Sequence, residues 1–162
     1  MMMPAKLPDE SLLRAELVKL LCEGQAHVTL EHALENLVPK HRSLRPGVGD
    51  LKSIWEILEH MRIAQRDILD YIRDPSYTSP TWPEGYWKAL PEEVLYDVWM
   101  DTVEGFLDDR EVLVDLANQA DLTTPLPHTD GHTVLRELLL AADHNAYHLG
   151  QIVFVRKLLE GS

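Results

Sequence analysis

The chain has 162 residues, the size of one domain, so we expect residues 1–162 to form a single domain. Its 27 acidic and 15 basic side chains give a formal net charge of −12, which argues against nucleic acid or an anionic membrane surface as a partner. No apolar run approaches the roughly 18 residues of a membrane span, and no secretory signal is expected at the start. The single cysteine, Cys22, excludes an internal disulfide and indicates a reducing, cytoplasmic setting.

Hydrophobic periodicity predicts five helices separated by Pro-rich and Gly-rich segments. Asp9 and Asp50 are expected to cap the first and third helices. Pro39 ends the second helix, and Pro91 suits the first turn of the fourth. The predicted helices cover, in chain order, about residues 9–23, 26–38, 50–73, 91–118 and 132–160.

No segment shows the alternation typical of a strand, so the predicted fold is all-α. We expect an antiparallel four-helix bundle with an additional short N-terminal helix and a long aromatic loop over residues 74–90. Trp82 and Trp87 in this loop are either a lid or pocket wall, or ordinary loop packing on the bundle. Sites in bundles are built from side chains that project inward from facing helices.

Three polar side chains of the last helix share an otherwise apolar stripe. At about 100° per residue, His144, His148 and Gln151 lie on one face of this helix. Burying an imidazole costs free energy unless it finds a partner, and a metal ion is one such partner. The spacing leaves two alternatives open, metal ligands or hydrogen-bonded core histidines. His132 precedes His144 by about 18 Å along the axis of an unbroken helix, so it cannot share a site with His144 and His148.

A third histidine lies on the predicted helix over residues 50–73. His60 sits near mid-helix at the edge of the apolar face, so a facing helix would bring it against the pair on the last helix. Three histidines with an open position are typical of a catalytic zinc or similar divalent ion. Glu56, one turn earlier, is a candidate ligand, orienting carboxylate or base, and Asp67 shares this face. The alternative for both acids is a solvated helix flank.

Two of these segments resemble motifs of the DinB-like family. Residues 143–151, DHNAYHLGQ, resemble its C-terminal signature of two histidines four residues apart followed by Gly-Gln, and residues 55–60 resemble its second-helix motif. The resemblance covers nearly the whole chain and implies a four-helix bundle in which His60, His144 and His148 hold a divalent metal. Relatives include thiol S-transferases that use bacillithiol or mycothiol and maleylpyruvate isomerase-like proteins, and members are often homodimers. The chain departs from the family in its aromatic loop and in Leu149, where an Arg is common.

Two functions follow from this sequence. The first is a zinc-dependent or nickel-dependent enzyme that performs thiol S-transfer or hydrolysis on a small molecule, with a low-molecular-weight thiol as candidate co-substrate. Glu56 would serve as base, Tyr147 or Tyr71 would donate a proton, and Asp67, Gln151, Trp82 and Trp87 would surround the site. The alternative is a non-catalytic metal-binding or interaction protein, because a metal stabilises a bundle whether or not it does chemistry. An open coordination position in a pocket would favour the enzyme.

Overall fold

The computed structural model describes residues 10–161 and contains five α-helices and no β-strand within that range. The predicted all-α class is therefore confirmed. None of these helices combines the length and apolar character that crossing a membrane requires. The elements are α1 (Glu10–Cys22), α2 (Leu30–Leu34), η1 (Pro39–His41), α3 (Ile54–Arg73), η2 (Glu84–Tyr86), α4 (Tyr96–Gln119) and α5 (Val134–Glu160), where η marks a short 3₁₀ turn.

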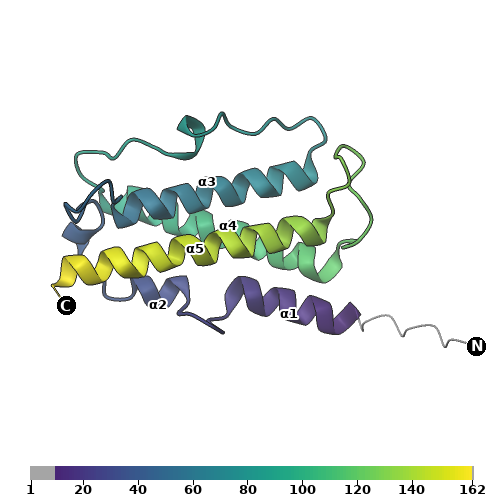
Figure 1. Cartoon of the computed structure of the whole chain (residues 1–162), viewed down its shortest axis with the longest axis horizontal. Helices are drawn as coiled ribbons and strands as arrows, with labels where there is room; N and C mark the ends of the chain where they lie inside the picture. Colours follow the sequence, from purple (N-terminus) through teal and green to yellow (C-terminus); the bar gives the residue numbers. More distant parts are fainter. Residues whose placement is uncertain (1–9, 162) are drawn as a thin grey trace, which may run out of the picture.

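The longest helices, α3, α4 and α5, lie side by side, with α3 packed against both of the others (Figure 1). The N-terminal helix α1 packs against α4 and α5, and the short α2 packs against α5. In Figure 1, α1 and α2 lie along one side of α5 and α3 lies along the other. The loop between α3 and α4 returns along the outer side of α3, where η2 contacts that helix.

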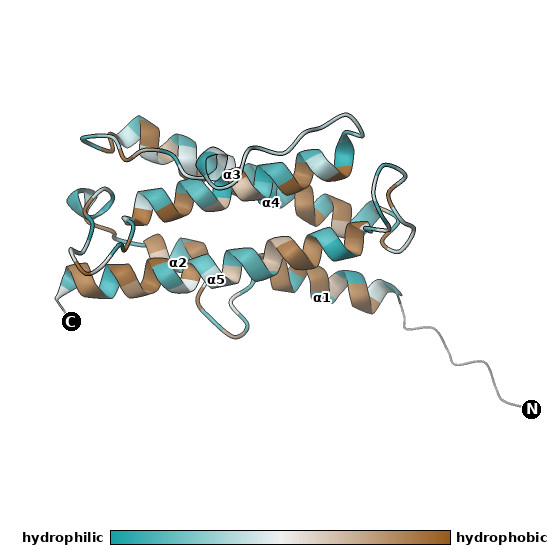
Figure 2. Cartoon of the chain, turned by 45° about the horizontal axis from the view of Figure 1, so that its top comes forward, coloured by the Kyte–Doolittle hydropathy of each residue, from teal (hydrophilic) through white to brown (hydrophobic). Residues whose placement is uncertain are grey.

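Two apolar clusters hold α3 and α5 together. One joins the first half of α3 to the second half of α5 and includes Leu58 and Ile152, both fully buried. The other joins the second half of α3 to the first half of α5 and includes Leu69 and Leu138. The two helices therefore run in opposite directions with their midpoints adjacent. Figure 2 shows that these helices carry hydrophilic residues as well as hydrophobic ones, and the buried polar side chains include Gln65 on α3 and Glu137 on α5.

The start of α3 differs from the predicted cap at Asp50. Ser53 caps this helix: its hydroxyl accepts a hydrogen bond from the Glu56 backbone N–H at 3.2 Å, and the Glu56 carboxylate accepts from the Ser53 N–H at 2.9 Å. This reciprocal pair is a capping box, which satisfies two backbone donors at once and outcompetes a lone aspartate three residues earlier. The expectation for Asp50 was wrong.

The second helix is shorter than the predicted range 26–38. Thr29 caps it by accepting from the His32 backbone N–H at 3.2 Å, so the helix starts after this residue. Asn36 has a φ of 56°, outside the right-handed helical region, and the helix ends before it. Glu35, with a ψ of 130°, has already left the helical conformation, so the helix ends at Leu34 and not at Pro39, where the sequence had indicated its end.

The fourth helix begins at Tyr96, five residues after the predicted start at Pro91. Val94 is buried in the core and Leu95 is extended, with φ −62° and ψ 160°. The chain places the Val94 side chain in the core while it is still non-helical, and α4 begins only after Leu95, which periodicity alone does not reveal. The predicted cap at Asp9 lies outside the described residues.

Candidate metal centre

Three histidine side chains meet where the midpoints of α3 and α5 lie together. The Nε2 atom of His60, on α3, lies 3.1 Å from the Nε2 atoms of both His144 and His148, which are one turn apart on α5. Each ring offers one nitrogen, and these nitrogens all lie within 4.8 Å of one another. His60 and His148 are buried and His144 is half-buried. The structure thus brings together the three residues that the sequence singled out.

Hydrogen bonds on the far side of two rings place their protons. His60 Nδ1 donates to the Tyr86 carbonyl oxygen at 2.9 Å, and His148 Nδ1 donates to Gln151 Oε1 at 2.7 Å. In the neutral rings the Nε2 atoms therefore carry lone pairs that face each other. Lone pairs 3.1 Å apart repel unless a proton or a cation lies between them.

The spacing of the nitrogens fits a divalent metal ion. Metal–nitrogen bonds of about 2.0–2.1 Å in a tetrahedral arrangement separate the nitrogens by about 3.3 Å. The observed 3.1 Å is close to that value. The remaining tetrahedral position has no fourth residue of this cluster, since the group within residues 10–161 consists of three histidines. Catalytic zinc sites commonly have three protein ligands and an open position, whereas structural zinc sites have four protein ligands.

Burial keeps the three imidazoles neutral. It is the main cause that lowers the pKa of each ring, and for His144 the neighbouring His148 and His60 add to it and bring the pKa to about 4. At neutral pH the rings are therefore uncharged, the state in which imidazole coordinates metal.

A polar contact between α3 and α5 fixes their register at the level of the histidines. Asn145, next to His144, donates from Nδ2 to Gln65 Oε1 at 2.8 Å. Gln65 is only 1% exposed and donates in turn to the Phe106 carbonyl oxygen of α4 at 2.7 Å. A shift of α5 by one turn would leave Gln65 Oε1 without its donor in the core, which costs free energy.

Aromatic side chains surround the histidines. The Trp87 ring stacks on His60 with centroids 4.0 Å apart and an interplanar angle of 3°. The Tyr147 ring meets His148 edge-on at 4.9 Å and 88°. Trp87 belongs to the loop after α3, so this loop covers one side of the cluster.

A pocket of about 370 Å³ opens beside His148, one of the three histidines. This volume lies in the range of small-molecule sites. The side chains that line it include His148 and four residues selected from the sequence, namely Gln151, Trp82, Trp87 and Tyr147. Trp82 and Tyr147 are 68% and 65% exposed, so they stand at the mouth.

The carboxylate of Glu56 is occupied by hydrogen bonds at the start of α3. Its carboxylate accepts hydrogen bonds from the Ser53 N–H and from the Arg45 guanidinium, whose Nε lies 2.9 Å away. Burial raises the pKa of this carboxyl group, but the hydrogen bonds from Arg45 and Ser53 outweigh it and hold the pKa below the ordinary value. These contacts stabilise the helix start and explain why a buried acid occurs here.

Asp67 contacts the aromatic loop. Its Oδ2 accepts a hydrogen bond from the Tyr86 hydroxyl at 2.7 Å. Tyr86 thus has two contacts with α3, since its backbone carbonyl also accepts from His60. The sequence reasoning missed Tyr86, and the only signal for it was the position of Asp67 on the same face as His60, two turns later.

His132 lies in a separate cluster near the start of α5. Its Nδ1 is 3.0 Å from the Tyr71 hydroxyl and 3.2 Å from the buried carboxylate of Glu137. His128 also lies here, with Nε2 2.7 Å from the Tyr71 carbonyl oxygen. These contacts hold the loop before α5 on the end of α3.

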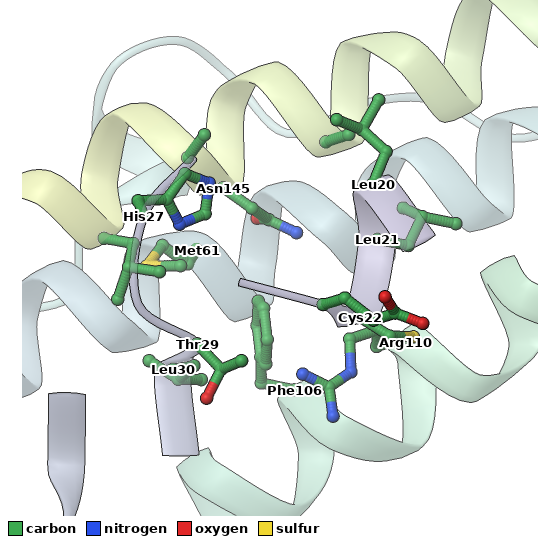
Figure 3. A pocket seen from close by; sticks show the side chains of 14 residues that line it. Leu20, Leu21, Cys22, His27, Thr29, Leu30, Met61, Phe106, Arg110 and Asn145 are labelled. Atoms are coloured by element: carbon green, nitrogen blue, oxygen red, sulfur yellow. The ribbon is translucent and has the colours of Figure 1, made fainter. Parts of the chain in front are cut away.

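Cys22 lines a much smaller hollow of about 30 Å³, together with Arg110 and Asn145 (Figure 3). The space suffices for about two water molecules and not for a substrate. Burial is the main cause that raises the pKa of the Cys22 thiol, which disfavours the nucleophilic thiolate. This hollow is not a competing active site.

Comparison with known protein families matches residues 6–152 to the model described as the DinB superfamily. The matched range covers most of the chain and contains His60, His144 and His148. No curated protein and no solved structure matches the chain.

Proposed function

The chain belongs to the DinB superfamily, and we propose that it is a divalent-metal-dependent enzyme that acts on a small molecule by thiol S-transfer or hydrolysis. The convergence of three histidine Nε2 atoms beside an open pocket carries this proposal. Zinc or nickel is the proposed metal, because imidazole ligands suit both ions. The proposed architecture is a single domain over residues 1–162, an antiparallel four-helix bundle with a short additional helix and a long aromatic loop.

The ligands in this proposal are the Nε2 atoms of His60, His144 and His148. A bound divalent ion would act as a Lewis acid and lower the pKa of a thiol or water molecule. The three imidazoles are neutral, so the ligand set favours an anionic group at the open position. Tyr86 and Gln151 hold two of the rings through Nδ1 and keep their Nε2 atoms directed inward.

Tyr147 is the proposed proton donor to the substrate. Its ring contacts His148 and lines the pocket, so a ligand in the pocket would meet this side chain. We assign Glu56 no role as a base, because its carboxylate already binds Arg45 and Ser53. The open pocket favours an enzyme over the alternative of a non-catalytic metal protein.

The family resemblance supports two further parts of the proposal, a homodimeric assembly and a low-molecular-weight thiol as co-substrate. A cytoplasmic location agrees with the single cysteine. Neither part is needed for the metal centre itself.

The test is a screen of zinc-loaded and nickel-loaded protein for thiol addition to small electrophiles and for hydrolysis of small esters and amides. We expect turnover that is lost in His148→Ala and retained in His32→Ala, since His32 is an exposed histidine outside the pocket. Turnover that survives in His148→Ala would contradict a reaction at this centre. Metal-loaded protein that is inactive throughout the screen would favour the non-catalytic alternative.

A further inference from the structure

The pocket beside the histidines has a chemical character of its own that indicates which ligands it accepts. Its floor is apolar, formed by the buried side chains of Ile57 and Val155. Its mouth is aromatic, with Trp82, Tyr147 and Phe154 at 68%, 65% and 54% exposure.

These exposed rings are concentrated at one place. Four aromatic side chains are exposed in the described part of the chain, and only Tyr96 lies away from this pocket. Large exposed apolar groups that gather on one surface mark a binding site more often than chance exposure. Flat aromatic walls above an apolar floor favour a planar apolar ligand, because ring stacking and burial of apolar area both contribute to binding.

One cation at the rim is available to such a ligand. Lys52 lines the pocket, and its Nζ lies 5.7 Å from the Trp87 ring centroid. It forms an ion pair with Glu56 Oε1 at 3.7 Å, a distance longer than a hydrogen bond, so this carboxylate does not take up its N–H donors.

The charged side chains around Lys52 give this rim no net negative charge that would repel an anion. Arg45 binds Glu56 directly and also faces Asp50, the other acid of this rim. The negative charges of Glu56 and Asp50 are thus balanced by the positive charges of Arg45 and Lys52. The three neutral histidines add no negative charge. A divalent ion held by them would leave the pocket positive overall.

We propose that this pocket binds an aryl carboxylate, with its flat ring against the aromatic mouth and its carboxylate at Lys52. This inference rests on the proposed function, because it takes the pocket as the substrate site of the metal centre. The 370 Å³ volume accommodates a one-ring or two-ring compound and not a long chain.

Two probes of equal shape separate charge from ring binding. The probes are 2-naphthoate and its neutral amide, 2-naphthamide, titrated into zinc-loaded protein and followed by calorimetry. An ion pair that is partly exposed to water contributes up to about 1 kcal/mol, so we expect the naphthoate to bind about five-fold more tightly than the amide.

Three variants test the assignment of each part. Lys52→Met is expected to reduce the preference for naphthoate over naphthamide and to leave the affinity for naphthamide unchanged. Phe154→Ala, on the exposed side of α5, is expected to weaken both probes by a similar factor. Lys40→Met, at an exposed position in η1 outside the pocket, is the matched control and should change neither.

Metal content measured on the same samples separates this inference from the proposed function. Zinc-loaded protein that binds the two probes equally, or a Lys52→Met variant with the same preference for naphthoate as the wild type, overturns the ligand class and leaves the metal centre standing. Protein that takes up no zinc or nickel overturns the proposed function, and the substrate assignment with it.

Discussion

Replacement of Gln151 by leucine tests whether the hydrogen bond to His148 prepares the metal centre. Gln151 Oε1 accepts from His148 Nδ1 at 2.7 Å, and leucine has a similar volume but no acceptor. The loss of such a partner weakens metal binding by about 10- to 100-fold, or about 1.4–2.7 kcal/mol. Because Gln151 is half-buried, water can replace part of the lost bond, and we expect about ten-fold weaker binding.

The assay is a competition titration of zinc between the protein and a chelating indicator. Gln151→Glu keeps an acceptor at this position and is expected to retain affinity. Gln25→Leu is the matched control, since Gln25 is exposed and its side chain bonds only to Glu23. Equal zinc affinity in Gln151→Leu and the wild type would refute the idea that this bond orients the ligand.

Three further predictions concern the surrounding structure. Tyr86→Phe removes the hydrogen bond to Asp67 and should weaken zinc binding several-fold in the same titration, with the helical circular dichroism unchanged. Arg45 and Ser53 hold the pKa of Glu56 below its ordinary value, so its carboxylate stabilises the fold above about pH 4.5 and this stability is lost as the pH falls below that value. In urea unfolding, the free energy of unfolding of Glu56→Gln should therefore fall less on acidification than that of the wild type. Leu138→Ala should cost about 2–5 kcal/mol in urea unfolding at neutral pH, because this side chain is fully buried.

The histidine cluster was predictable because it depends on helix geometry and on the positions of the histidines near the midpoints of two paired helices. A period of 3.6 residues places His144 and His148 on one face, and a facing helix needs only its own midpoint histidine to complete the set. The antiparallel pairing of α3 with α5 supplies that histidine, His60.

The partners of the candidate acids were less predictable. Periodicity placed Glu56 on the same face of its helix as His60. It could not show that Arg45, in the preceding loop, binds the Glu56 carboxylate. The sequence contains the capping-box pattern Ser53-x-x-Glu56, and this pattern predicts that α3 starts directly after Ser53. His41 is only 7% exposed, because η1 turns it inward.

Contacts made by loop backbone could not be predicted from the sequence. The carbonyl oxygen that orients His60 belongs to Tyr86, and every residue has such a carbonyl. Which one reaches the ring depends on the path of the loop over α3, and this path follows from tertiary packing.

The central claim is that His60, His144 and His148 bind one divalent ion, and metal content measured by plasma mass spectrometry tests it most directly. Tag-free wild-type protein is compared with the triple variant His60→Ala/His144→Ala/His148→Ala, with circular dichroism as a check on the fold. The account predicts about one divalent ion per chain in the wild type and none in a variant that remains helical. Wild-type protein that takes up no metal after reconstitution with zinc, nickel and manganese would contradict it, and the three histidines would then be hydrogen-bonded core residues.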